Sequence, residues 1–128
     1  MPKPKASEVT TTVATEKDAL KMADALVGSC LAACVQFWPI RSLYRWRGKL
    51  ESGKEYRLSC KTRNARVPAL IRFIRTRHSY EVPEIIATPI ANGHPAYLKW
   101  IERETQSPRL TFPPPPTRKR ASRSGRTA

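Results

Sequence analysis

The chain has 128 residues, a length typical of one domain with at most one appended tail. Lysine and arginine total 24 against 10 acidic residues, so the formal net charge is +14, and apolar residues make up 40% of the chain. No stretch reaches the ~18 apolar residues of a membrane span, which excludes an integral membrane protein. The basic start lacks the apolar region of a secretory signal, so we expect none.

The first elements are a strand and a helix. Residues 8–14 are rich in β-branched side chains, which predicts a strand. Thr15 is the predicted N-cap of the helix that follows, because Glu16 and Asp18 place negative charge in its first turn. Apolar positions at helical spacing continue this helix to about Ser29.

A hairpin is predicted next. Residues 33–38 form a buried strand, which we expect to bulge or bend at Pro39 and to resume over residues 42–46. Residues 48–53 supply turn chemistry, and residues 55–62 are the returning strand.

The second half of the chain continues with helix, strand and helix. Asn64 is the predicted cap of the second helix, with Pro68 tolerated in its first turn. The apolar stripe of this helix is Val67, Leu70, Ile71 and Ile74. Residues 85–91 form the fourth predicted strand, and residues 95–104 a short final helix.

The predicted order is β-α-β-β-α-β with a C-terminal helix. This is the ferredoxin-like α+β arrangement, in which two helices cover one face of a four-stranded antiparallel sheet. The other face is left bare, so we expect a partner subunit to cover it. We expect a flexible N-terminus over residues 1–6, one domain over residues 7–105, and a disordered tail over residues 106–128.

The tail is rich in proline and strongly basic. It contains four consecutive prolines and no acidic residue. Its candidate anion-binding residues are Arg118, Lys119, Arg120, Arg123 and Arg126. Such a tail can bind nucleic acid or an acidic surface by releasing counterions, or it can simply keep the protein soluble. A nucleic-acid-binding module is therefore the alternative function.

Several runs of residues carry a family resemblance. They are residues 31–35 (LAACV), 42–51 (SLYRWRGKLE), 78–86 (HSYEVPEII) and 97–100 (YLKW). In this order and spacing they resemble the CutA family, called divalent-cation tolerance proteins, over about residues 7–105. The resemblance implies a ferredoxin-like subunit of a homotrimer whose sheets pack edge to edge around a threefold axis. It also implies a cytoplasmic protein linked to copper and other divalent metals, with no agreed enzymatic activity.

The resemblance also suggests a metal site. The copper ligands ascribed to bacterial members match Val13, Arg77 and His78, of which only His78 is a metal ligand. The candidate ligands for copper or another divalent cation are therefore His78, Glu81 and Glu84. The other interpretation of His78 is packing against Tyr80 at a helix C-terminus.

A second set of residues matches a family cleft between subunits. It comprises Tyr44, Trp46, Glu55, Lys61, Tyr80, Glu84 and Trp100. The set forms either interface packing with paired charges, or a pocket for a small ligand or a metal. The three cysteines match no disulfide or zinc spacing and are expected to pack, in a reduced cytoplasmic protein. No catalytic triad pattern or phosphate loop is present, so we do not expect an enzyme.

Overall fold

The computed structural model describes residues 5–106, and the statements below concern that part of the chain. Its elements are β1 (Ala6–Val13), α1 (Glu16–Gly28), β2 (Cys34–Trp46), β3 (Lys49–Arg63), a 3-10 turn (Asn64–Arg66), α2 (Val67–Arg77), β4 (Ile85–Pro89) and α3 (Pro95–Glu104). The strands form one antiparallel sheet in the order β2-β3-β1-β4. The predicted ferredoxin-like α+β class is confirmed. No helix of residues 5–106 has the length and apolar character needed to cross a bilayer.

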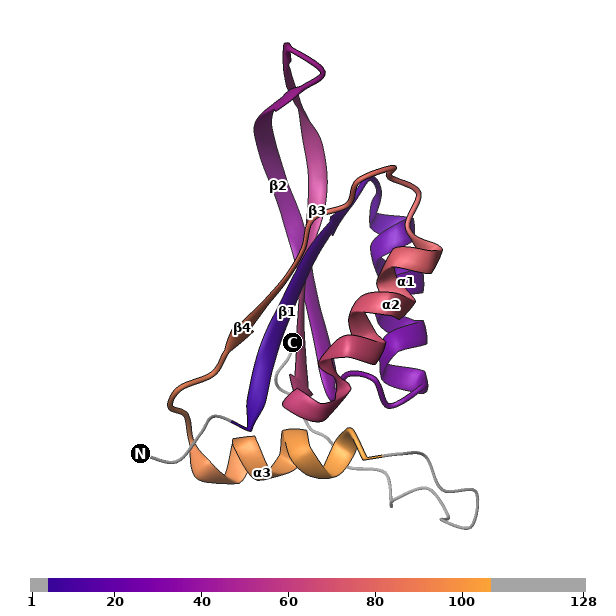
Figure 1. Ribbon diagram of the computed structural model, residues 1–128. Coiled ribbons are helices and arrows are strands. Elements are labelled where there is room, and N and C mark those ends of the chain that lie inside the picture. The colour runs from indigo at the N-terminus through magenta and orange to yellow at the C-terminus, as the bar shows by residue number, and fades with distance from the viewer. Residues whose placement is uncertain (1–4, 107–128) are drawn as a thin grey trace.

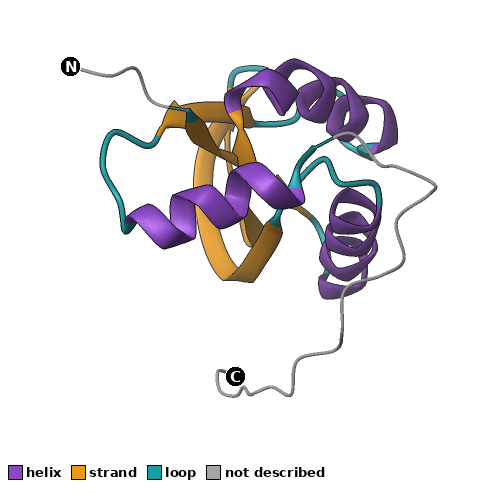
Figure 2. Cartoon of the chain, turned by 90° about the horizontal axis from the view of Figure 1, so that it is seen from below, coloured by secondary structure: helices purple, strands orange, loops and turns teal. Residues whose placement is uncertain are grey.

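The helices divide into two groups around the sheet. Helices α1 and α2 lie side by side against one face, and the β2–β3 hairpin extends beyond them (Figure 1). Helix α3 crosses the lower end of the sheet, as the view from below shows (Figure 2). In the described part of the chain, the face of the sheet opposite α1 and α2 has no helix over it, except at the lower end where α3 crosses (Figure 1 and Figure 2).

The core lies between the sheet and the pair α1 and α2. Its largest fully buried side chains are Val9, Leu26, Leu58, Leu70 and Ile74. Val9 and Leu58 lie at period-two positions of their strands, while Leu70 and Ile74 are four residues apart on α2, so each element turns one apolar face inward. A smaller cluster forms where Ile101 of α3 packs against Ala6 and Ala33.

The start of α1 follows the sequence prediction. The Oγ1 atom of Thr15 accepts a 3.0 Å hydrogen bond from the backbone N–H of Asp18. Thr15 itself is extended, as an N-cap must be, and Glu16 and Asp18 lie in the first turn. The predicted cap is confirmed.

The predicted bulge at Pro39 is wrong. Strand β2 runs without interruption from Cys34, opposite Lys61, to Trp46, opposite Lys49, in a constant register. Pro39 is accommodated because β2 is an edge strand, where a missing N–H can face away from the neighbouring strand.

The predicted turn over residues 48–53 is also wrong. Strand β3 begins at Lys49, and the turn consists of Arg47 and Gly48, with φ angles of 52° and 80°. Two left-handed residues form the kind of tight turn that matches the twist of a hairpin. Gly53 lies inside β3, opposite Ser42.

Asn64 does not cap α2. It opens the 3-10 turn, and α2 begins at Val67 with Arg66 as its N-cap, which makes no side-chain cap hydrogen bond. The Asn64 Oδ1 atom instead accepts a 2.6 Å hydrogen bond from the Ser7 hydroxyl, and so links the end of β3 to the start of β1. Pro68 lies in the first turn of α2, as predicted.

Candidate functional site

A pocket of about 800 Å³ lies between the β2–β3 hairpin and the segment of residues 78–84 that follows α2. We call it the Glu55 pocket. Its principal lining residues are Ser42, Tyr44, Trp46, Glu55, Tyr80 and Glu84. Period-two alternation along β2 turns Ser42, Tyr44 and Trp46 to the same face, because side chains two apart on a strand point the same way. The hairpin therefore forms one wall, and the segment after α2 forms the other.

The Glu55 carboxylate is held by two neutral donors. The Ser42 hydroxyl donates a 2.6 Å hydrogen bond to Oε1, and the Tyr80 hydroxyl donates a 2.7 Å hydrogen bond to Oε2. The ion pairs found among residues 5–106 do not include Glu55. Its negative charge is thus oriented by hydroxyl groups but is not neutralised.

Tyr80 is fixed as a hydrogen-bond donor in this arrangement. Burial raises the pKa of its phenol far above the ordinary 10.0, and the hydrogen bond to the Glu55 carboxylate adds to the increase in pKa. Ionised tyrosinate would face a carboxylate, so the neutral form is strongly favoured. The phenol therefore keeps its proton and its contact at physiological pH.

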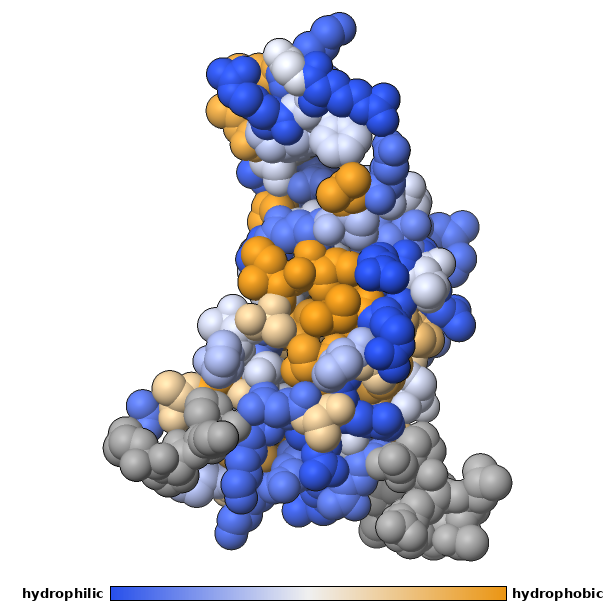
Figure 3. Space-filling view, in the orientation of Figure 1, coloured by the Kyte–Doolittle hydropathy of each residue, from blue (hydrophilic) through white to orange (hydrophobic). Residues whose placement is uncertain are grey.

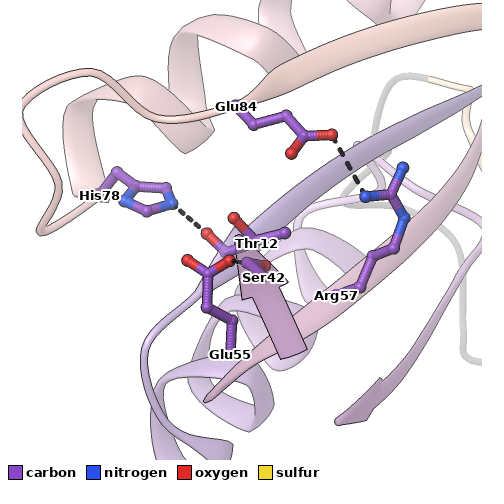
Figure 4. A network of polar contacts seen from close by, with 6 residues as sticks. All are labelled: Thr12, Ser42, Glu55, Arg57, His78 and Glu84. Atoms are coloured by element: carbon purple, nitrogen blue, oxygen red, sulfur yellow. Dashed lines mark hydrogen bonds and ion pairs between the residues drawn. The ribbon is translucent and has the colours of Figure 1, made fainter. Parts of the chain in front are cut away.

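The other two carboxylates of the pocket have cationic partners. Glu81 pairs with Arg47 at 2.8 Å on the exposed surface, and Glu84 pairs with the half-buried Arg57 at 3.2 Å. In Figure 4, Glu84 and Arg57 point toward one another, on the far side of Thr12 from Glu55. The two pairs tie the segment after α2 to the hairpin and to the sheet.

Both ring nitrogens of His78 are occupied. Nε2 lies 2.7 Å from the Thr12 carbonyl oxygen (Figure 4). Nδ1 accepts a 3.0 Å hydrogen bond from the backbone N–H of Tyr80. These contacts assign the Nε2–H tautomer, in which Nε2 donates to Thr12. The ring also packs against Tyr80, with centroids 4.8 Å apart. This arrangement matches the interpretation of His78 as a packed residue at the end of α2, and it leaves no lone pair for a metal.

The predicted metal ligands do not fit a divalent cation. His78 has no free nitrogen, and Glu81 and Glu84 are each paired with an arginine. Within residues 5–106 no three His, Cys, Asp or Glu side chains lie together as a metal-binding group. A site for copper normally needs several converging donors, so this set is not a coordination sphere as the side chains now stand.

The positions matched to the bacterial copper ligands line a separate pocket. It has a volume of about 340 Å³, and its charged or imidazole lining residues are Asp18, Lys21, Arg77 and His78. The Arg77 guanidinium lies over the Phe73 ring, 4.3 Å from its centroid. Two cations, Lys21 and Arg77, outnumber the single carboxylate of Asp18 here, so the net positive charge disfavours a metal ion.

The structure brings together five of the seven predicted cleft residues. Tyr44, Trp46, Glu55, Tyr80 and Glu84 line the Glu55 pocket, but Lys61 and Trp100 do not. Lys61 lies at the other end of β3, about 20 Å away along the strand, where it donates to Gln36 at 2.8 Å and to Ser59 at 2.7 Å. Trp100 stacks on Tyr97 of α3.

Sequence reasoning missed Ser42 as a site residue. Its period-two spacing from Tyr44 and Trp46 is the signal that places it on the pocket face. The predicted tail residues Arg118, Lys119, Arg120, Arg123 and Arg126 lie outside the described residues.

The cysteines differ in their surroundings. Cys60 is fully buried in the core, and burial raises the pKa of its thiol to about 12. Cys30 and Cys34 are half-buried, and the Cys34 sulfur lies 3.6 Å from the Tyr97 hydroxyl oxygen. Cys60 therefore serves as a core side chain rather than as a nucleophile.

Comparison with known proteins gives a consistent match. The family described as CutA1 divalent ion tolerance protein matches residues 7–104. Protein CutA of Mus musculus is 46% identical over 93 residues, which cover 72% of this chain and 52% of the mouse protein. The divalent-cation tolerance protein CutA of Thermus thermophilus is 42% identical over 95 residues, covering 73% of this chain and 92% of that protein. The chain thus spans about half the length of the mouse relative.

Solved structures show the same fold. CutA from Xylella fastidiosa has a TM-score of 0.78 at 36% identity, covering 80% of this chain and 99% of that one. The Thermus thermophilus divalent cation tolerance protein has a TM-score of 0.76 at 40% identity, covering 79% and 99%. The family match over residues 7–104 includes every strand and helix except the first residue of β1, and it includes both walls of the Glu55 pocket.

Proposed function

This chain belongs to the CutA1 divalent ion tolerance family, and we propose that it acts in the response to divalent metal ions as a homotrimer that binds a small ligand in the Glu55 pocket. The observation that carries this proposal is the pocket itself, in which an unneutralised carboxylate faces aromatic side chains in a space of about 800 Å³. Pockets of this size, with few oriented polar groups, are typical of small-molecule sites.

Exposed apolar side chains on the hairpin support assembly. Leu43 is 70% exposed, Leu50 64% and Trp46 37%, and β2 is an edge strand of 13 residues. A long apolar edge strand without cover favours pairing with another chain. Three subunits is the state that the family resemblance implies.

The β4 edge of the sheet supports the same conclusion. In Figure 3, apolar side chains gather at mid-height on the side of the molecule where β4 and α2 lie in Figure 1, and hydrophilic side chains surround them. Ile86 of β4 and Val82 just before it are 49% and 67% exposed. Another copy packed here would remove these side chains from water.

The proposal does not pass through a metal bound at His78. Both nitrogens of His78 make hydrogen bonds, and both candidate glutamates make ion pairs. Metal coordination there would break these contacts, which argues for a ligand in the Glu55 pocket instead.

Native mass spectrometry of the full chain, with and without Cu²⁺, tests the proposal. We expect three subunits per particle. We also expect the substitution His78→Ala to leave the amount of bound copper unchanged. Trp46→Ala should weaken the assembly, whereas Trp100→Ala should not, because Trp100 stacks on Tyr97 of its own chain. A monomer at micromolar concentration, or one copper per subunit that disappears with His78→Ala, would contradict it.

A further inference from the structure

We infer that the Glu55 pocket takes an organic cation, that is, a small molecule carrying a substituted ammonium group. This inference rests on one part of the proposed function, namely that a small ligand binds in this pocket. It adds the chemical class of that ligand, which the family's description as a divalent ion tolerance protein does not give.

The first argument is the charge of the pocket. Three of the chain's 10 acidic residues line it, although the chain as a whole carries 24 cations. Glu81 and Glu84 have arginine partners, but Glu55 has only the hydroxyls of Ser42 and Tyr80. A half-buried carboxylate without a cation is best compensated by a cation from outside.

The second argument is the aromatic lining. Tyr44 is 47% exposed and Trp46 37% exposed, and Tyr80 forms the opposite wall. The faces of such rings attract ammonium groups, and tryptophan does so most strongly. The Arg47 guanidinium already lies over one face of the Trp46 ring, 5.2 Å from its centroid. A ligand would therefore use the other face of Trp46 together with Tyr44 and Tyr80. Aromatic rings around one carboxylate therefore suit an ammonium group that carries alkyl substituents.

Other ligand classes fit less well. A divalent metal needs several charged or imidazole donors. In the described part of the chain, no group of three His, Cys, Asp or Glu side chains that could hold a metal ion includes Glu55. An anion would meet the Glu55 charge directly. Arg41 also lines the pocket, and a ligand carboxylate beside the ammonium group would have a partner there.

The test uses choline and dimethylbutanol, an uncharged analogue in which carbon replaces the quaternary nitrogen. Binding to the full chain is measured by calorimetry and by saturation-transfer NMR in phosphate buffer, because amine buffers are themselves organic cations. We expect choline to bind about tenfold more tightly than dimethylbutanol, since the uncharged analogue loses both the Coulombic attraction to the Glu55 carboxylate and the cation–π attraction to the rings.

Two matched variants locate the binding. Glu55→Gln keeps the shape of the side chain and should weaken choline binding about tenfold. Glu51→Gln makes the same charge change on the same strand, outside the pocket lining, and should leave the affinity within about twofold. Circular dichroism and the subunit count establish that both variants fold and assemble.

The outcomes separate this inference from the proposed function. The ammonium inference is overturned if choline does not bind, if choline and dimethylbutanol bind equally tightly, or if the two variants change the affinity equally. The proposed trimer, and a pocket ligand of another class, would still stand. A competition with Zn²⁺ is run in cacodylate buffer, because zinc phosphate is insoluble. If Zn²⁺ displaces choline from the Glu51→Gln variant but not from the Glu55→Gln variant, the ammonium inference is also overturned and the pocket is a metal site.

Discussion

The Tyr80 hydroxyl donates a 2.7 Å hydrogen bond to the Glu55 carboxylate, across 25 positions of the chain. The Tyr80 backbone N–H also donates to His78, whose other nitrogen contacts the Thr12 carbonyl. The segment after α2 is therefore anchored both to the end of β1 and to the hairpin. This anchoring positions one wall of the pocket against the other.

Removing the Tyr80 hydroxyl should loosen that wall. We expect Tyr80→Phe to lower the free energy of unfolding by about 1 kcal/mol, because the Glu55 carboxylate loses one of its two donors at a partly exposed position. Urea denaturation measures the loss, and hydrogen exchange should show faster exchange over residues 78–84.

The matched control is Tyr44→Phe. Tyr44 lines the same pocket. Unlike the Tyr80 hydroxyl, its hydroxyl makes no hydrogen bond to any residue in the described part of the chain. It should therefore change stability by less than about 0.5 kcal/mol. Equal losses in the two variants would show that the contact between Tyr80 and Glu55 does not stabilise the fold.

Stability should fall at alkaline pH through Cys60. Burial raises the pKa of this thiol from 9.0 to about 12 in the folded protein. Above pH 9.0 the unfolded chain releases this proton while the folded chain retains it, so the free energy of unfolding decreases as pH rises toward 12, and below pH 9.0 the contribution is constant.

Denaturation at several pH values checks this. Cys60→Ala lowers stability at every pH by removing core volume, but its decline between pH 9.0 and 12 should be shallower than that of the wild type. Tyrosine and lysine ionisation affects both proteins alike. Parallel declines would show that Cys60 does not cause the effect.

The hairpin should be sensitive to substitution at Gly48, in its turn, and tolerant of substitution at Gly53, inside β3. Gly48 has φ +80° and Gly53 has ordinary strand geometry, and an added Cβ meets no atom within 4 Å at either position. Gly48→Ala should therefore lower the free energy of unfolding by about 1 kcal/mol through backbone strain alone. Gly53→Ala should be neutral or stabilising, and the reverse order in urea denaturation would contradict the turn.

The basic tail should account for any binding to nucleic acid. Deleting residues 106–128 removes six cations and no acid, so affinity for duplex DNA should collapse while the circular dichroism of the domain is unchanged. In the full chain, binding should fall steeply with salt and show no sequence preference. Filter binding at two salt concentrations measures both, and equally tight binding by the shortened chain would assign the affinity to the domain.

Much of the fold could be predicted from local signals. The final helix has its predicted bounds, and the cap at Thr15 follows from residue types at adjacent positions. The turn could not be located, because Gly48 and Gly53 are equally typical of turns and only the backbone φ distinguishes them. The bulge predicted at Pro39 is wrong for a similar reason, since the effect of a proline depends on whether its strand lies at the edge of the sheet.

Most of the residues that line the site could be predicted from the sequence, but the hydrogen bonds between them could not. Family resemblance identified most of the aromatic and acidic lining, yet it included Lys61, which lies at the far end of β3. The contact of Glu55 with Tyr80 depends on how residues 78–84 fold back on the sheet. The occupation of both His78 nitrogens depends on the same segment, and local sequence patterns do not specify it.

A crystal structure of the full chain grown with choline is the most direct test of a ligand site at Glu55 in a trimer. We predict density for the quaternary ammonium group beside the Glu55 carboxylate and the Trp46 ring, in each subunit of a trimer. An empty pocket at saturating choline, or choline bound only at other surfaces, would contradict the account.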